Sequence, residues 1–182
     1  MVSKKYKTEK DSKTGLLRII ALKDFSDVKK GDEGGLIEKE ENLSQEGNCW
    51  VYCNARVCGN ARVYDNAQVY GEAQVYGEAS ISGDAWVYYK AKVFGSAQVY
   101  ENAQVCGEAQ VYGEASVSGK AKVFGSAQVC GKTRICGNAE INGAEEEIID
   151  IDIPIYSKYV DLSEVDKYCK DMRLVRKLYG KP

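Results

Sequence analysis

Apolar and polar residues alternate with a period of six positions over about half of the chain. From Cys49 to Ala144 the sequence divides into sixteen consecutive hexads without a gap. The first position is Ala in fourteen hexads, the third is Val or Ile in all sixteen, and the fifth is Gly in twelve. A register this regular indicates that the chain folds as stacked structural repeats.

The spacing within each hexad predicts short strands joined by tight corners. The first and third positions are two residues apart, so both point to the same side of an extended segment. Gly at the fifth position and a polar residue at the sixth favour a sharp turn. Three such sides make a triangular coil of about eighteen residues, and coils stack about 4.8 Å apart. Sixteen hexads therefore predict about five coils. A helix is excluded because this spacing forms no single stripe at a period of about 3.6 residues.

The hexads, such as Ala-Gln-Val-Tyr-Gly-Glu at 67–72, resemble those of the hexapeptide-repeat superfamily of left-handed parallel β-helices. The resemblance covers residues 49–144 and implies an all-β, left-handed triangular β-solenoid. The preceding segment, 18–44, resembles the head of little-characterised hexapeptide-repeat proteins of bacteriophages and prophages. This second resemblance implies a phage or prophage origin and no particular reaction.

Residues 1–48 are expected to form an N-terminal hairpin and cap. Tyr6 to Glu9 and Leu16 to Phe25 have the composition of two strands joined by a polar turn. Leu36 and Ile37 follow a glycine-rich loop, and we expect them to cover the open end of the first coil. Solenoids need such caps because a terminal coil exposes an unpaired edge.

Residues 145–182 are expected to form a C-terminal strand and helix after the solenoid domain of 49–144. Isoleucines alternate with polar residues from 149 to 155, which predicts one strand, and Pro154 favours an edge position. A helix is predicted to start at Ser163 with one apolar stripe. This helix packs as a cap or serves in oligomerisation, and its stripe contains Val165, Cys169, Met172, Val175 and Leu178.

Stacking at eighteen-residue intervals places the second and fourth positions of every third hexad on one face. This register predicts that both tryptophans and four tyrosines share one side of the prism: Trp50, Tyr52, Tyr70, Trp86, Tyr88 and Tyr89. Such a surface fits an interface with a second subunit or another protein. A ladder of rings that stack only on one another, and a small-ligand pocket, are the alternatives.

The amino-acid composition excludes several kinds of active and binding site. The chain contains no histidine, which excludes Ser-His-Asp and Cys-His mechanisms and imidazole ligands for metals. The seven cysteines lack zinc-site spacing, and none lies eighteen residues from another, so no disulfide between adjacent coils is predicted. The net charge is -2 and the basic residues do not form columns, so nucleic-acid binding is not expected.

The superfamily resemblance also implies acyltransferase activity that uses a histidine base between the subunits of a trimer. The absence of histidine removes the group that this chemistry needs. We therefore expect no catalytic residues, no cofactor and no metal.

The sequence thus favours a non-catalytic phage or prophage scaffold or binding module that forms a homo-oligomer, either a trimer or a dimer. An alternative is a protein that sequesters a host signalling nucleotide as an anti-defence measure, by stacking a base on an aromatic ring. A host protein is another possible partner. The N-terminus lacks the apolar region of a secretory signal, and the longest apolar run is too short to span a membrane. The expected location is the cytoplasm of a bacterial host cell.

Overall fold

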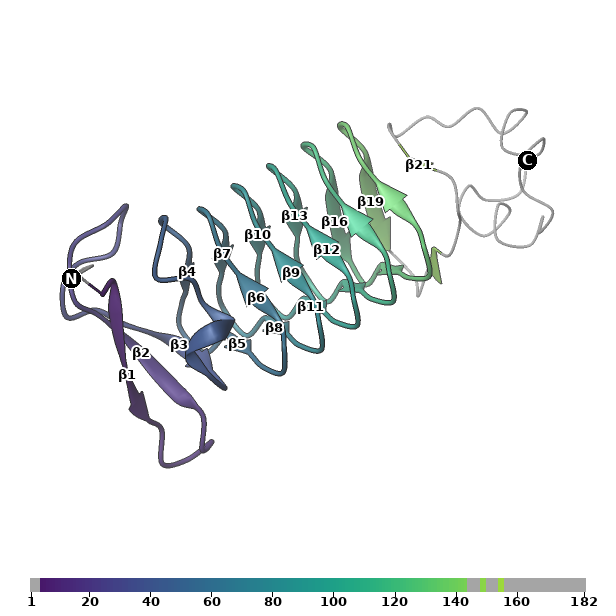
Figure 1. The fold of residues 1–182 in the computed structure, drawn as a ribbon. Helices are drawn as coiled ribbons and strands as arrows, with labels where there is room; N and C mark the ends of the chain where they lie inside the picture. The colour runs from purple at the N-terminus through teal and green to yellow at the C-terminus, as the bar shows by residue number, and fades with distance from the viewer. Residues whose placement is uncertain (1–3, 144–147, 150–153, 156–182) are drawn as a thin grey trace, which may run out of the picture.

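The computed structural model describes residues 4–143, 148–149 and 154–155, which form a prism of stacked, parallel coils (Figure 1). A short 3-10 helix, η1 (Glu40–Asn42), is the one helical element among these residues. None of the described helical residues makes a helix long and apolar enough to cross a membrane. The all-β solenoid predicted from the hexads is therefore confirmed.

Each side of the prism is one parallel sheet. The first sheet contains β4 (Trp50–Val51), β7 (Gln68–Val69), β10 (Trp86–Val87), β13 (Gln104–Val105), β16 (Lys122–Gly125) and β19 (Glu140–Gly143). The second contains β5 (Arg56–Val57), β8 (Gln74–Val75), β11 (Lys92–Val93), β14 (Gln110–Val111), β17 (Gln128–Val129) and β20 (Ile148–Ile149). The third contains β6 (Arg62–Val63), β9 (Ser80–Ile81), β12 (Gln98–Val99), β15 (Ser116–Val117), β18 (Arg134–Ile135) and β21 (Pro154–Ile155).

The small and β-branched positions of the hexads form the core. Val69, Val87 and Val105 lie in register on adjacent coils and are fully buried, as are the alanines two positions before them. Successive coils are joined by backbone hydrogen bonds, such as that from the Gln68 N–H to the Ala85 carbonyl at 2.9 Å. The backbone N–H and carbonyl groups of each coil are therefore hydrogen-bonded to those of adjacent coils, while Ala and Val fill the narrow interior.

The N-terminal hairpin is present as predicted. Strands β1 (Tyr6–Lys10) and β2 (Leu17–Ala21) are antiparallel, and β2 pairs with β3 (Glu33–Ile37). The Asp11 carboxylate holds the turn by accepting hydrogen bonds from the Lys13 and Thr14 N–H groups, at 3.1 and 2.8 Å. Strand β3 pairs in parallel with β5, so the hairpin extends the second sheet at its N-terminal end.

The solenoid continues beyond the hexads at both ends, which gives about six turns instead of five. At the N-terminal end, β3 and the bridge between Leu43 and Val63 supply sides of an additional coil. At the C-terminal end, the prediction of one strand over 149–155 is wrong. Strand β20 pairs with β17 in the second sheet, whereas β21 pairs with β18 in the third.

The two described strands of this isoleucine-rich segment, β20 and β21, therefore lie on different sides of the solenoid. Gln128 is paired with Ile148, and Arg134 with Pro154, so the coil step here is twenty residues instead of eighteen. Pro154 does lie in the outermost described strand of its sheet, where its missing N–H is tolerated. The predicted C-terminal helix, with Val165 to Leu178, lies outside the described residues.

Candidate binding surface

Five aromatic side chains gather on the outer side of the first sheet and at its following corner: Tyr52, Tyr70, Trp86, Tyr88 and Tyr89. We call them the aromatic surface. Tyr70 stacks on Tyr88 with ring centroids 5.1 Å apart and an angle of 8° between the planes. Tyr70 also contacts Tyr52 and Trp86 edge-on, at 6.1 and 6.3 Å. The eighteen-residue register thus brings these five residues together as predicted.

Trp50 does not belong to this surface, and its predicted place there is wrong. Its indole is only 1% exposed because the N-terminal segment covers the first coil. Tyr6 and Phe25 pack edge-on against it, with centroids 6.1 and 5.3 Å away. Trp50 does lie in the predicted column with Gln68 and Trp86. Its burial was missed because the residues that cover it precede the repeat and do not follow its pattern.

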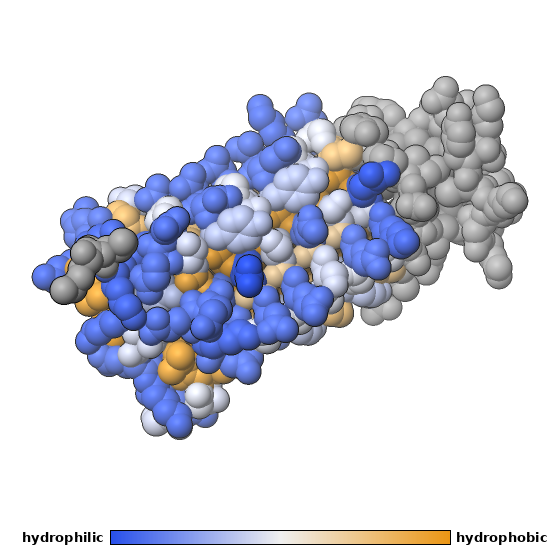
Figure 2. Space-filling view, in the orientation of Figure 1, coloured by the Kyte–Doolittle hydropathy of each residue, from blue (hydrophilic) through white to orange (hydrophobic). Residues whose placement is uncertain are grey.

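The side chains of the aromatic surface differ in exposure. Trp86 is 40% exposed and Tyr89 is 66% exposed, whereas Tyr52, Tyr70 and Tyr88 are half-buried by one another. Figure 2 shows that hydrophilic side chains cover most of one face of the molecule. Large exposed aromatic groups on an otherwise polar protein are typical of sites that contact a partner.

The backbone at Tyr89 is strained in a way that its neighbours avoid. Tyr89 occupies the fifth position of its hexad and has a φ of 60°, in the left-handed region that favours glycine. Gly71 and Gly107 hold the same position on the adjacent coils, with φ values of 76° and 72°. A side chain in this conformation costs about 1–2 kcal/mol. Residues held in such strain cluster at functional sites.

Cys53 is a second residue of this kind, on the same corner as Tyr89. Its φ is 54°, and its side chain is exposed. A cavity of about 230 Å³ lies beside it and is lined by Asp27, Tyr52, Cys53, Gln68 and Tyr70. The corner that borders the aromatic surface therefore carries two strained, exposed side chains. The corner after the third sheet carries two more, Asp65 and Glu101, whereas every fifth-position residue from 59 to 131 on the corner after the second sheet is glycine.

The tyrosine hydroxyls of the aromatic surface are hydrogen-bond donors. Burial, and then the hydrogen bond from its O–H to Asp27 Oδ1 at 2.7 Å, raise the pKa of Tyr52. Burial and the neighbouring Cys106 raise the pKa of Tyr88, whose hydroxyl donates to Gln104 Oε1 at 3.3 Å. Both groups therefore stay protonated at neutral pH, and the surface offers neutral rings with polar edges.

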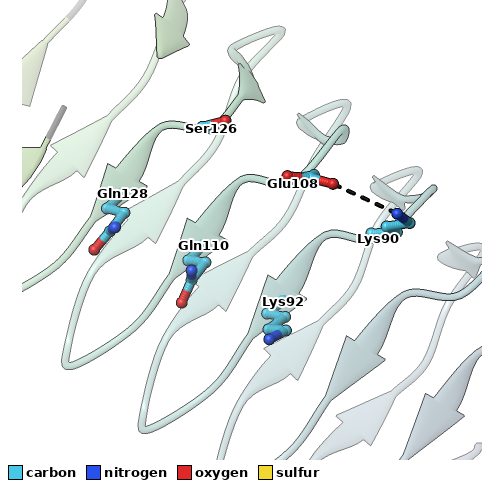
Figure 3. Close-up of a pocket in the computed structure, with 6 residues that line it drawn as sticks. All are labelled: Lys90, Lys92, Glu108, Gln110, Ser126 and Gln128. Carbon is cyan, nitrogen blue, oxygen red and sulfur yellow. Dashed lines mark ion pairs between the residues drawn. The ribbon is translucent and has the colours of Figure 1, made fainter. Parts of the chain in front are cut away.

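A polar groove runs along the corner between the first and second sheets (Figure 3). We call it the corner groove. It has a volume of about 330 Å³ and is lined by Lys90, Lys92, Glu108, Gln110, Ser126 and Gln128. Lys90 forms an ion pair with Glu108 at 3.5 Å, whereas Lys92 forms no ion pair within the described part of the chain.

The corner groove was not predicted from the sequence. One of its walls is an outward column on the second sheet, in which Lys92 lies between Gln74 and Gln110. The sixth position of one hexad and the second position of the next flank the same corner. At this corner both positions are lysines, Lys90 and Lys92, and this pair was the sequence signal for the groove.

The described residues do not place three or more Cys, Asp or Glu side chains together as a metal site would need. The six cysteines among them form no disulfide. Among the described residues we take the aromatic surface as a candidate site for stacking and apolar contact, and the corner groove as a candidate site for polar contact.

Two comparisons bear on the repeat. Residues 55–71 match a family model described as the YdcK Beta solenoid repeat. The "Uncharacterized acetyltransferase YdcK" of Escherichia coli (strain K12) is 52% identical over 48 residues, which are 26% of this chain and 15% of that protein. The match thus spans a small fraction of the relative's length. Together with the stacked coils, it supports membership of a repeat β-solenoid family; the phage origin stays a prediction.

Proposed function

We propose that this protein is a non-catalytic binding module that self-associates through the aromatic surface. The observation that carries the proposal is Tyr89, which is 66% exposed and keeps a left-handed backbone where both column neighbours are glycine. The exposed ring adds little to the core, so folding stability does not account for its presence. Contact with another molecule is the role that we propose for it.

The exposed rings can form the apolar centre of an interface. Large aromatic side chains bury about 150–250 Å² each. The exposed fractions of Trp86 and Tyr89, 40% and 66%, leave roughly 200 Å² to be covered in each protomer. A symmetric contact uses this area twice, roughly 400 Å², whereas a specific interface buries about 1,200–2,000 Å² in total. The proposed contact therefore also covers polar side chains around the two rings.

Sedimentation analysis of Trp86→Gln tests the proposal with little risk to the fold. Gln occupies the equivalent position in both adjacent coils, at Gln68 and Gln104. We expect a dimer or trimer for the wild-type chain at micromolar concentration, and a monomer for the variant. Tyr64→Ser is the matched control, because Tyr64 is 38% exposed on the third sheet and Ser82 follows it in the column. A monomeric wild-type chain contradicts the proposal.

Capture of a nucleotide is a second candidate, favoured by the corner groove. The strained Tyr89 is followed directly by Lys90, and Lys92 presents an ammonium group without an ion pair among the described residues. A base stacked on the ring and a phosphate held by lysine would use these groups. The test is a thermal-shift screen with cyclic and ADP-ribose-type nucleotides, and Lys92→Gln as the variant. Binding raises the melting temperature.

Acyl transfer comes into question through the superfamily resemblance and through the name of the Escherichia coli relative. This chain contains no histidine to serve as the base, and the match covers 15% of the relative. We therefore expect no acetyl transfer when the protein is incubated with acetyl-CoA and amine or hydroxyl acceptors. Formation of free CoA that depends on an acceptor would contradict the non-catalytic assignment.

A further inference from the structure

A lysine and a cysteine meet inside the N-terminal end of the solenoid. Lys5 is 1% exposed and Cys49 is fully buried. The Lys5 Nζ donates to the Cys49 Sγ at 3.2 Å, across 44 positions of sequence. Lysine is among the residue types least often found fully buried, so this contact requires an explanation.

The surrounding groups hold the amine against the sulfur. Lys5 Nζ also donates to the carbonyl oxygens of Cys49 at 2.9 Å and Glu46 at 3.2 Å. The ring of Phe25 lies 5.3 Å from the same nitrogen. The Lys5 N–H donates to the Gln45 side chain at 2.8 Å, which fixes the backbone beside the amine. The nitrogen therefore has a defined position, and its nearest reactive neighbour is the thiol.

Cys49 is also exceptional within the repeat. It occupies the first position of its hexad, where fourteen of the sixteen hexads have Ala. An alanine would fill this inward position without a sulfur, so the core does not require a thiol. Burial lowers the pKa of Lys5 and raises the pKa of Cys49.

We propose that Lys5 and Cys49 are the site of an oxidative N–O–S cross-link. One oxygen atom of dioxygen is inserted between Nζ and Sγ. An N–H bond and the S–H bond break, an N–O and an O–S bond form, and the two hydrogens leave with the second oxygen atom as water. The amine and the thiol together lose four electrons, which reduce the dioxygen. Two molecules of hydrogen peroxide supply the same oxidation and yield three molecules of water.

The cross-link would fasten the N-terminal segment to the first hexad. Closing a loop of this length restricts the unfolded chain, as a disulfide does. We expect the oxidised protein to melt roughly 5–10 °C higher than the reduced one. A thiol reductant would return the amine and the thiol and abolish the difference. The inference does not depend on self-association, because both groups lie under the hairpin and not on the aromatic surface.

Peptide mapping of the full chain after exposure to dioxygen or hydrogen peroxide tests the proposal. The expected product joins the peptides that contain Lys5 and Cys49 and exceeds their summed mass by one oxygen atom less two hydrogens. Dithiothreitol should reverse it. The cross-link should be lost in Lys5→Arg and in Cys49→Ala, the second of which restores the commonest residue of this hexad position. Both variants should lose the increase in melting temperature that oxidation gives the wild type.

Cys58→Ser is the matched control. The Cys58 thiol is half-buried beside the charges of Glu38 and Arg56, and its replacement should leave the cross-link intact. Oxidation of Cys49 to a sulfinic acid, or recovery of an unmodified Cys49 after oxidation of the exposed cysteines, would overturn the proposal. A cross-link between Lys5 and a different cysteine would also overturn it.

Discussion

Close stacking of the corners predicts a large difference between two Gly→Ala substitutions that share one backbone conformation. Gly113 and Gly15 both have a φ of 74°. A Cβ at Gly113 would lie 3.0 Å from the N and 3.1 Å from the O of Gly131 on the next coil. A Cβ at Gly15, in the turn of the hairpin, would have nothing within 4 Å. Comparing the two substitutions therefore separates the cost of backbone strain from the cost of a steric clash between coils.

The expected losses follow from these two terms. A left-handed Ala costs about 1–2 kcal/mol, and removing a glycine from the unfolded chain returns about 0.5–1 kcal/mol. Gly15→Ala should therefore reduce the free energy of unfolding by about 1 kcal/mol. Gly113→Ala adds an overpacking cost of about 1–3 kcal/mol, because backbone atoms of the next coil must move. Its total loss should be about 2–4 kcal/mol.

Urea titration followed by circular dichroism measures both losses, and an unchanged dependence on urea concentration confirms that the same transition is compared. Equal losses for the two variants would refute the reasoning. Equal losses would show that adjacent coils move apart to admit a Cβ without a loss of stability. The only cost of the natural side chains at Cys53, Asp65, Tyr89 and Glu101 would then be their left-handed backbone conformation.

Two further predictions concern the N-terminal cap. Asn42→Ala should lower the free energy of unfolding by about 3 kcal/mol in the same titration, because the buried amide donates to the Gly59 and Ala61 carbonyls at 3.0 and 2.8 Å. Tyr6 donates its hydroxyl to the Leu43 carbonyl at 2.7 Å, and burial raises its pKa above the ordinary value of 10.0. Its stabilising contribution is complete below pH 10 and declines as the pH rises further, so Tyr6→Phe should weaken the alkaline loss of stability.

The periodic part of the fold is predictable from the sequence because every hexad meets the same packing requirement. Ala and Val at the first and third positions fill a narrow interior, and this requirement sets the eighteen-residue stacking that brings Tyr70 and Tyr88 together. A one-position shift would turn every apolar side chain outward. The register, the three sides and the aromatic column were therefore predictable.

The non-repeating contacts were not predictable in this way. Trp50 belongs to the repeat, but its burial depends on Phe25 and Tyr6 in a segment with another pattern. After Gly143 the coil step lengthens to twenty residues, which no hexad signals. The Lys5–Cys49 contact arises in the same way, since it joins the cap to the first hexad. Long-range packing of a cap leaves no periodic trace in the sequence.

Tyr89→Gly tests most directly whether the aromatic surface is kept for binding. The substitution restores the glycine found on both adjacent coils and removes a ring that is 66% exposed. Sedimentation and urea titration of this one variant measure association and folding together.

We expect a free energy of unfolding within about 1 kcal/mol of the wild type, since relief of strain offsets the loss of the ring contact with Tyr88. The dissociation constant should rise at least about tenfold, the effect of losing about 1.4 kcal/mol of contact. Unchanged association, or a loss of folding stability that accounts for the weaker association, would contradict the account.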